Sequence, residues 1–395
     1  MNQKLLLFVV GLLFSICTFA AAPDSVASVL RKIDSIAKST RSNVSVTAIH
    51  IENHKKISYN GSTPCFMAST VKIPIAITFL DKVDRNQGSL EDIMRLSAKD
   101  SVPGSGGLYY LLRKKELDIS LRHLIKHMLV TSDNSASDAV LRKVNGPQAV
   151  LEKMHALGFE HTFVNRSILE TFVDTHDGDH ALLYQPHTSD SLEKTLNRIP
   201  LSRKTEAWKR FENDIRDTTT SDDMALLLDK LYEGEILSRS STNFLINTME
   251  QCKTGRRRLK GLLPPRTEVA HKTGTWSIFS GGLKYPVTKQ LYRFASDVGI
   301  ITLPNNKGHV AIAVYVKSRS ASGMDRSRVI AAVSRVMYDY FLHDKTVVVQ
   351  KAQKKSLVKL PKKDPNEVSN GMCQLGEPCD LFNNSDLNKT LGIPG

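Results

Sequence analysis

The sequence predicts an α+β protein in which one antiparallel sheet is built from both chain ends and a helical region is inserted between them. Three observations support this fold class. Alternating, β-branched segments come early in the chain, a long stretch with helical periodicity follows, and strand-like segments return near the end. The 395 residues, of which 41% are hydrophobic and 24% charged, are also enough to bury a sizeable core.

The first segments of this fold are expected to be a helix and a hairpin. Residues 26–40 carry apolar side chains at helical spacing. Residues 43–52 alternate in strand fashion, residues 55–60 do so again, and the Asn-His-Lys between them can turn. The hairpin would supply the first strands of the sheet.

The middle of the chain, from Ser69 to about Glu250, has mostly helical periodicity, and Thr220 or Ser221 can cap one of its helices. Strand character then returns in three segments, and an amphipathic helix follows them. We expect the strands at residues 267–275, 293–303 and 309–318, and the helix at residues 325–344.

These elements define the predicted organisation of the chain. A domain is expected over residues 22–344, with its sheet part at about 26–68 and 262–344 and its helical part at about 69–261. Residues 345–395 are rich in Lys and punctuated by Pro, so this tail is expected to be a flexible extension.

The N-terminus has the layout of a secretory signal peptide over residues 1–21. Lys4 precedes an apolar run, Leu5–Phe19, which ends in the small residues Ala20–Ala22. The alternative is a retained membrane anchor, because Leu5–Ala22 just reaches spanning length. Cleavage is favoured, since no basic stop-transfer cluster follows. We therefore expect a periplasmic or secreted protein.

The cysteines remaining after cleavage are even in number, as is common in an oxidising compartment. Cys373 and Cys379 could close a small loop, which would leave Cys65 to pair with Cys252. No Cys or His cluster has metal-ligand spacing, so neither a metal nor another cofactor is expected.

The net charge of +14 raises the question of a nucleic-acid partner. An exported protein rarely meets nucleic acid, and aromatic residues are not interleaved with the basic ones, so no such partner is expected. A solvated basic surface is the simplest explanation. Electrostatic contact of the tail with anionic wall polymers or a membrane surface is the alternative, and the protein is expected to be a monomer.

Four S-x-x-K sequences occur, and their surroundings separate them. Ser35–Lys38 lies on an amphipathic helix, and two others lie in polar stretches. Only Ser69–Lys72 lies at a turn-to-helix transition among apolar residues. Ser69 is a good N-cap, and Lys72, three residues on, would lie on the same helix face. A desolvated Lys72 could therefore take a proton from the Ser69 hydroxyl.

Two further motifs carry polar groups that could face the same cleft. Ser132 and Asn134 are two residues apart, so both point the same way in an extended loop, while Asp133 ties the loop down. Taken alone, this segment is better explained as the N-cap of the following helix.

The sequence His-Lys-Thr-Gly-Thr follows an apolar strand. Lys272, with Thr273 and Thr275, could hold an anion, and Gly274 would let a ligand approach the backbone. The second K-T-G, at Lys253, precedes a run of arginines and is expected to face solvent.

S-x-x-K, S-D-N and K-T-G in this order form the signature of the class A β-lactamases and related penicillin-recognising serine hydrolases. The chain resembles this family over roughly residues 26–343, including the segments "DSVPGSGGL" and "TGRRRLKGLLPPRTEVAHKTGT". The resemblance implies a three-layer α/β/α fold and an acyl-enzyme mechanism without a cofactor.

The resemblance also implies a role for each motif residue. Arg258 stands where some members have an Arg that assists carboxylate binding, although a surface Arg is about as good an explanation. The resemblance makes Ser69 the nucleophile, Lys72 its activator and Ser132 the proton shuttle. Asn134 would hold the acylamide side chain of the substrate, and Lys272 and Thr273, with Gly274 beside them, would hold its carboxylate. The N–H groups of Ser69 and Thr275 would form the oxyanion hole.

The sequence departs from the family where hydrolytic members carry the Glu that activates water. If Arg166 matches the family's Arg, Ile168 occupies the Glu position, and Glu170 could substitute only if the loop shifts by two residues. Residues 170–218 are also longer than the family's loop. Their His and Asp residues suggest a polar surface insertion more than a metal site.

Three functions follow from these observations. The preferred one is a secreted serine β-lactamase. The alternative is a penicillin-binding-protein-like DD-peptidase or transpeptidase acting on peptidoglycan stem peptides, or another serine esterase or amidase, with slow β-lactam deacylation. The third is a binder that acylates once or only grips wall peptides.

Overall fold

The computed structural model describes residues 25–184, 189–277, 291–320 and 322–344. These residues belong to a unit that ends at residue 348. The expected signal peptide (1–21) and tail (345–395), with Cys373 and Cys379, lie outside the described residues.

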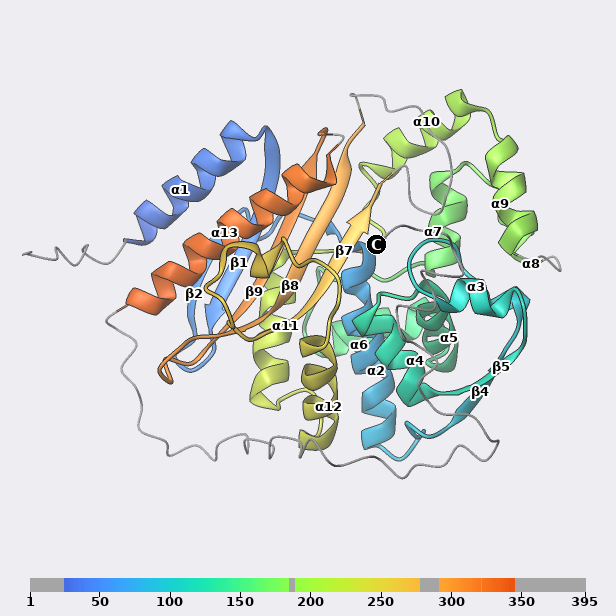
Figure 1. Cartoon of the computed structure of the whole chain (residues 1–395), viewed down its shortest axis with the longest axis horizontal. Coiled ribbons are helices and arrows are strands. Elements are labelled where there is room, and N and C mark those ends of the chain that lie inside the picture. Colours follow the sequence, from blue (N-terminus) through green and yellow to red (C-terminus); the bar gives the residue numbers. More distant parts are fainter. Residues whose placement is uncertain (1–24, 185–188, 278–290, 321, 345–395) are drawn as a thin grey trace, which may run out of the picture. The chain divides into compact units, whose positions relative to one another are not determined.

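A five-stranded antiparallel sheet joins the two ends of this unit, as the sequence predicts (Figure 1). The hairpin formed by residues 42–59 pairs with the last strand, so residues far apart in the sequence lie side by side. The strands run in the order β2 (Lys55–Tyr59), β1 (Ser42–His50), β9 (His309–Ser318), β8 (Arg293–Thr302) and β7 (Val269–Trp276).

Helices cover both faces of the sheet, which gives the three layers expected of the fold. On one face lie α1 (Val26–Ser39) and α13 (Gly323–His343), and on the other lies α11 (Ser221–Glu233), capped by Thr220 as predicted. Strand β9 shows why helices cover both faces of the sheet. Its Val310, Ile312, Val314 and Val316 pack with α1 and α13, while Ala311, Ala313 and Tyr315 belong to the core on the other face.

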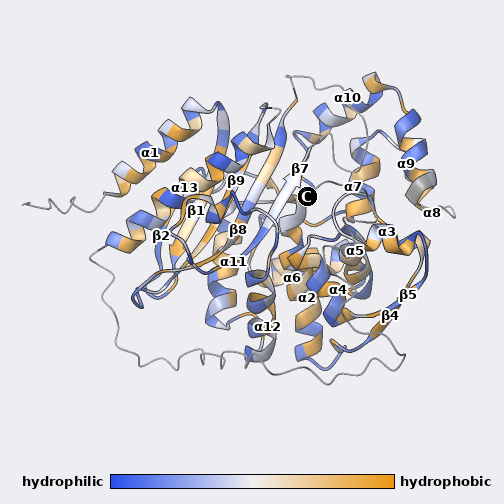
Figure 2. Cartoon of the chain, viewed as in Figure 1, coloured by the Kyte–Doolittle hydropathy of each residue, from blue (hydrophilic) through white to orange (hydrophobic). Residues whose placement is uncertain are grey.

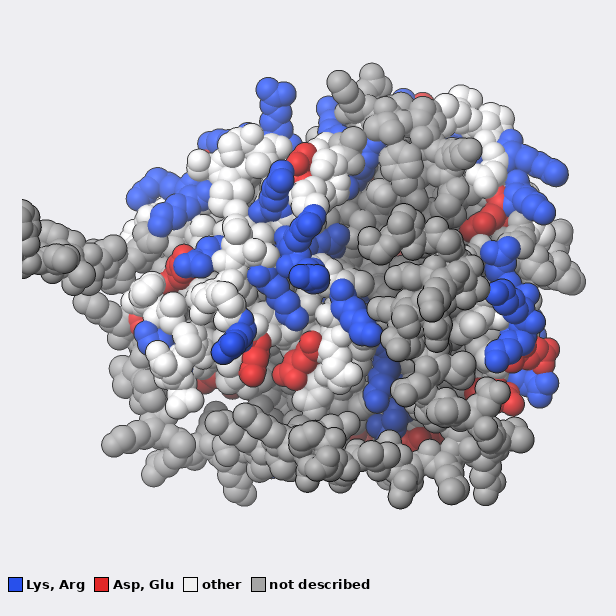
Figure 3. All heavy atoms as spheres, viewed as in Figure 1, with Lys and Arg blue, Asp and Glu red and all other residues white. Residues whose placement is uncertain are grey.

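Helix α1 shows why a surface helix forms here. Its buried residues, Val29, Ile33 and Ala37, recur every fourth position and so make one apolar stripe. In Figure 2 the helix carries hydrophobic and hydrophilic residues side by side along its length. On the face of the molecule in Figure 3, Lys and Arg clearly outnumber Asp and Glu over α1 and α13, in line with the net charge of +14.

The inserted region is mainly helical, as expected, but its described residues also form two small sheets, which the expected helical part at about 69–261 did not include. β3 (Cys65–Phe66) pairs with β6 (Thr218–Thr219), and β4 (Ile93–Leu96) pairs with β5 (Leu117–Ser120). The α-helices are α2 (Lys72–Asp84), α3 (Leu108–Leu112), α4 (Leu121–Val130), α5 (Asn134–Lys143), α6 (Pro147–Ala156), α7 (Ile168–Thr175), α8 (Ala181–Tyr184), α9 (Ser189–Arg198), α10 (Leu201–Phe211) and α12 (Arg239–Glu250). Three 3-10 turns are η1 (Ala68–Val71), η2 (Ala98–Asp100) and η3 (Leu259–Leu262).

Two further findings concern cysteines and membranes. Cys65 and Cys252 are both free thiols, so the expected pairing between them is wrong. Among the described residues, no helix combines the length and the apolar character that a membrane crossing requires.

Candidate active site

Ser69 lies in the 3-10 turn η1, immediately before the central helix α2. It is not the helix cap that its sequence position suggests, because Met67 and Val71 precede η1 and α2, and neither caps through its side chain. Ser69 is half-buried, and its hydroxyl makes no hydrogen bond to any residue in the described part of the chain. The oxygen therefore remains available to a substrate.

Lys72 begins α2 and is completely buried. Its Nζ donates to the backbone oxygen of Ser132 (2.6 Å) and to Oδ1 of Asn134 (2.9 Å), and lies 3.2 Å from Ser132 Oγ. Burial, together with the charge of Lys272, holds the pKa of Lys72 well below its ordinary value. This environment is the one that a basic, neutral amine requires.

The loop that presents Ser132 and Asn134 is held in an unusual backbone conformation. Ser132 has a φ of 61°, in the left-handed region that non-glycine residues rarely adopt. Asp133 stabilises the loop because its carboxylate accepts hydrogen bonds from the N–H groups of Leu108 and Ala136, each at 2.9 Å. Asp133 is thus the N-cap of α5, and its neighbours line the cleft, so both interpretations of this segment hold.

Strand β7, at the edge of the sheet, supplies the third group of residues. Lys272 is completely buried, and its Nζ donates to Ser132 Oγ (3.0 Å) and to the Thr273 carbonyl (2.8 Å). Burial lowers the pKa of Lys272 to about 8. A Cβ atom on Gly274 would lie 2.6 Å from the Met67 carbonyl oxygen, so only glycine lets β7 approach the turn that carries Ser69.

Arg258 is not a surface arginine. Its Nη1 donates to the carbonyl oxygens of Gly274 (2.7 Å) and Ser296 (2.8 Å), and Nη2 donates to Thr275 Oγ1 at 2.6 Å. The guanidinium therefore fixes β7 and faces the same cleft as Thr275.

The second K-T-G lies partly in the cleft, because Thr254 and Gly255 line it. Lys253 is exposed, so the expectation that this segment faces solvent is correct for the lysine alone. Thr254 Oγ1 lies 2.7 Å from Thr273 Oγ1, and Gly255 has a φ of 74° and lines the cleft. The following arginines misled the interpretation. Arg256 and Arg257 are exposed, whereas Arg258 turns inward.

A single cleft of about 550 Å³ brings these groups together. Of the predicted site residues, Ser69, Ser132, Asn134, Thr273, Thr275 and Arg258 line it, while Lys72 and Lys272 lie buried behind Ser132 and Gly274 lies between two lining residues of β7. The sequence reasoning missed other lining residues: Gly104, Ser105, Tyr109, Tyr110, Arg113, Phe172, Glu193, Thr254, Gly255 and Trp276. Apart from the Gly-rich segment before Leu108 and the second K-T-G, they carried no motif signal.

A buried thiol, imidazole and carboxylate lie beside Lys272. His271 and Asp297 are both completely buried, with Nδ1 of the imidazole 2.8 Å from the Asp297 carboxylate. Although burial opposes the charged form, Asp297 raises the pKa of His271 to about 9. Cys252 lies close by, and its Sγ is 3.3 Å from Thr254 Oγ1. This group adds charge behind the cleft without lining it.

A second, smaller cavity lies on the other side of Ser69, and here the family's carboxylate is absent. Ile168, Thr171, Asp217 and Trp276 are among its lining residues. Ile168 is the first residue of α7 and is 8% exposed, so it offers this cavity only hydrocarbon.

Glu170 does not take the place of the missing carboxylate. Its Oε2 accepts the Ser167 N–H at 2.6 Å, and its N–H donates to Ser167 Oγ at 3.1 Å, which makes a capping box at the start of α7. Glu170 lines neither of the two cavities around Ser69. The two-residue loop shift that would bring it there does not occur.

Another buried carboxylate, Asp138, anchors the same helix. It accepts the N–H groups of Ile168 (2.9 Å) and Leu169 (3.0 Å). Burial raises the pKa of Asp138 to about 6. Both of its oxygens are thus committed to the backbone at the start of α7.

The long segment after Ile168 forms the helices α7 to α10 and is tied to the domain through Arg166. Nε of Arg166 donates to Asp217 (2.6 Å), and Nη1 donates to Asp174 (2.7 Å) and Asp214 (3.2 Å). The last helix of the segment adds Phe211 to a cluster of rings, formed by Phe66, Phe172, Phe211, Trp276 and Phe294, that walls the site.

Comparisons with known proteins agree with this geometry. The sequence profile of the beta-lactamase enzyme family matches residues 28–341. A beta-lactamase from Bacteroides uniformis is 26% identical over 83% of this chain and 96% of its own length, and the extended-spectrum beta-lactamase PER-1 from Pseudomonas aeruginosa is 26% identical over 82% and 92%. The crystal structure of TLA-3 extended-spectrum beta-lactamase superposes with a TM-score of 0.64 and 29% identity, over 80% of this chain and all of that one (100%).

Proposed function

The chain belongs to the beta-lactamase enzyme family, and from this premise we propose that it is an exported serine β-lactamase that opens β-lactam rings through an acyl-enzyme on Ser69. The observation that carries the proposal is the position of Ser132 Oγ, which lies 3.2 Å from the Nζ of Lys72 and 3.0 Å from the Nζ of Lys272. The contact of two buried amines, those of Lys72 and Lys272, with the one hydroxyl of Ser132 has no evident structural use. The same contacts would serve proton transfer through Ser132.

In this mechanism the Ser69 oxygen attacks the lactam carbonyl carbon and its proton passes to the neutral amine of Lys72. The ring C–N bond then breaks, and Ser132 passes a proton to the leaving nitrogen. The N–H groups of Ser69 and Thr275 would stabilise the oxyanion. Protonated Lys272, helped by Thr273, would hold the substrate carboxylate, with Arg258 adding positive charge.

Substrate recognition would use the rest of the cleft. Asn134 donates its Nδ2 to the Pro103 carbonyl at 2.7 Å, so its amide is oriented for the acylamide side chain of a substrate. Export, a monomeric state and contact of the basic tail with cell-wall polymers or a membrane surface belong to the same proposal.

The direct test is intact-mass detection of a penicillin adduct on the purified mature chain, together with turnover of the chromogenic cephalosporin nitrocefin. We expect one adduct per chain and its loss in Ser69→Ala. The matched control is Ser35→Ala, because Ser35–Lys38 has the same spacing on an exposed face of α1. An adduct that persists in Ser69→Ala would overturn the proposal.

A second candidate is supported by Ile168. Because α7 presents no carboxylate to the two cavities around Ser69, and Asp217 in the smaller cavity is paired with Arg166, the acyl-enzyme lacks the family's base for its hydrolysis. The protein would then release β-lactams slowly and act as a DD-peptidase or transpeptidase on D-Ala–D-Ala stem peptides. A stoichiometric nitrocefin burst that then stops, with D-Ala release from such a peptide, would support this candidate; rapid multiple turnover would exclude it.

A further inference from the structure

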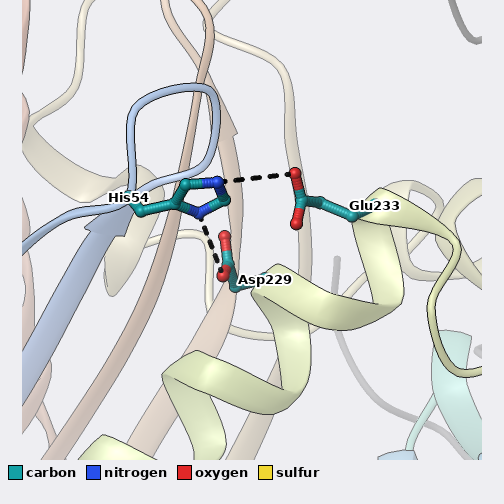
Figure 4. Close-up of side chains that lie close together, drawn as sticks. All are labelled: His54, Asp229 and Glu233. Atoms are coloured by element: carbon teal, nitrogen blue, oxygen red, sulfur yellow. Dashed lines mark ion pairs between the residues drawn. The ribbon is translucent and has the colours of Figure 1, made fainter.

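Three potential metal ligands meet where the turn between β1 and β2 approaches the end of α11 (Figure 4). His54 belongs to the turn, whereas Asp229 and Glu233 are four residues apart on α11 and so lie on the same face of the helix. One ligand atom from each residue can be chosen so that all three lie within 4.8 Å of one another. His54 lies far from the other two residues in the sequence, so no local motif indicates a site.

Asp229 is unusual because its charge is buried without a hydrogen bond. Its side chain is only 6% exposed, and its Oδ1 has no hydrogen-bond partner among the residues that the structure describes. The His54 imidazole approaches Oδ2 only to 3.9 Å, beyond hydrogen-bonding distance. Buried carboxylates normally receive hydrogen bonds, pair with a cation or coordinate a metal.

The surroundings of Asp229 add further negative charge. The Glu233 carboxylate faces the same imidazole as Asp229 does. Both carboxylates also lie in the last turns of α11, which ends at Gly234, and the helix dipole is unfavourable to anions at this end. His54 faces Asp229 with one ring nitrogen and Glu233 with the other, each at 3.9 Å.

We propose that His54, Asp229 and Glu233 bind a divalent transition-metal ion, with Zn²⁺ as the ion that suits them best. Imidazole nitrogen and carboxylate oxygen are both ligands that zinc accepts, and water would complete the coordination. The imidazole favours zinc over Ca²⁺ and Mg²⁺, which prefer oxygen ligands alone. The ion would compensate the unpaired Asp229 carboxylate and connect the hairpin to α11.

The site would stabilise the fold and take no part in the chemistry at Ser69. Helix α11 starts at Ser221, four residues after Asp217, which lines the smaller cavity beside Ser69. The far end of the helix is roughly 18 Å from this start at 1.5 Å per residue. The proposal therefore does not depend on the proposed function.

The test measures zinc binding to the purified mature chain after removal of metals with a chelator. We expect calorimetry to give one Zn²⁺ per chain, and we expect Co²⁺ to produce visible d–d absorption bands typical of nitrogen and oxygen ligands. His54→Asn and Glu233→Gln should weaken zinc binding by more than about 100-fold, more than the loss of an outer-shell partner usually costs. Zinc should also raise the unfolding temperature of the unchanged protein but not of His54→Asn.

The variants are chosen so that the chain still folds. His54 has a φ of 56°, and Asn is the non-glycine residue that tolerates this conformation best. The matched control is His161→Gln, since His161 is also exposed and lies 3.7 Å from a carboxylate of α11, Asp223. Within the part of the chain that the structure describes, His161 belongs to no group of three potential ligands. Zinc binding that is absent in the unchanged protein, or that His54→Asn and Glu233→Gln leave intact, would overturn the proposal.

Discussion

Replacement of Arg166 by Met is the sharpest test of how the segment beside Ser69 is held. The Arg166 side chain is 3% exposed and pairs with Asp174, Asp214 and Asp217. Arg216 also pairs with Asp174 and Asp214. Asp217 is different, because Arg166 is its only ion-pair partner among the residues that the structure describes.

The structure sets the expected magnitude. Removing one partner of a buried ion pair costs roughly 3–5 kcal/mol, because the other charge stays buried and uncompensated. Asp217, whose side chain is 8% exposed, would keep hydrogen bonds from the N–H groups of residues 165 and 166. We therefore expect Arg166→Met to lower the free energy of unfolding by about 3 kcal/mol at pH 8, the lower end of that range.

The decrease in the free energy of unfolding caused by Arg166→Met should also depend on pH. Burial already raises the pKa of Asp217 in the folded protein, and loss of the guanidinium will raise it further. A carboxyl group with a raised folded-state pKa binds more protons when folded, so stability increases as pH falls. The deficit of Arg166→Met relative to the unchanged protein should accordingly be smaller at pH 5 than at pH 8.

Urea unfolding of Arg166→Met, Asp217→Asn and the double variant at both pH values measures these quantities. We expect the double variant to be more stable than the sum of the single losses predicts. The control is Arg95→Met, whose partner Glu116 is 56% exposed and whose loss should cost less than about 1 kcal/mol. A similarly small cost for Arg166→Met, or equal deficits at the two pH values, would refute the reasoning.

Three further predictions concern the cleft. Ile168→Glu should speed hydrolysis of the acyl-enzyme by about 10²–10⁴-fold, as a positioned general base does, and Ile168→Gln should not; single-turnover release of a penicillin adduct measures both. Because burial lowers the pKa of Lys272 to about 8, kcat/KM for nitrocefin should fall as pH rises through that value, and an alkaline limit near 10 would contradict the assignment. Gly274→Ala should destabilise the fold by about 1–3 kcal/mol in thermal unfolding. Gly107→Ala should not, because no described atom lies within 4 Å of the new methyl group. Equal effects of the two substitutions would show that the close approach of β7 is unimportant.

Much of the site could be predicted because its signals are local. Lys72 follows Ser69 by three residues at a helix start, and Asn134 follows Ser132 by two in a loop, so each pair had to share a direction. Lys272 follows an apolar strand, and the structure brings it to Ser132. The fold class could be predicted for the same reason, since alternation in the strands and four-residue spacing in the helices are visible along the chain.

The parts that failed depend on contacts between distant segments. Ser69 was expected to cap a helix, but it lies in the 3-10 turn η1. The chain enters this turn through Ala68 with a φ of 48°, and the sequence contains no pattern that predicts this conformation. For Arg258 the sequence left a binding role and a surface position open, and only the contacts with β7 show that it turns inward. The pairing of Cys65 with Cys252 was inferred only from the even number of cysteines, which says nothing about the distance between the two thiols.

The register of the sheet has a consequence for biogenesis. Ser42 near the start of the folded unit pairs with Ser318 near its end, so the central strand pair cannot form until nearly the whole unit has been synthesised. Contacts so distant in sequence slow folding. If the chain is exported as proposed, this delay would keep its hairpin unpaired until after translocation.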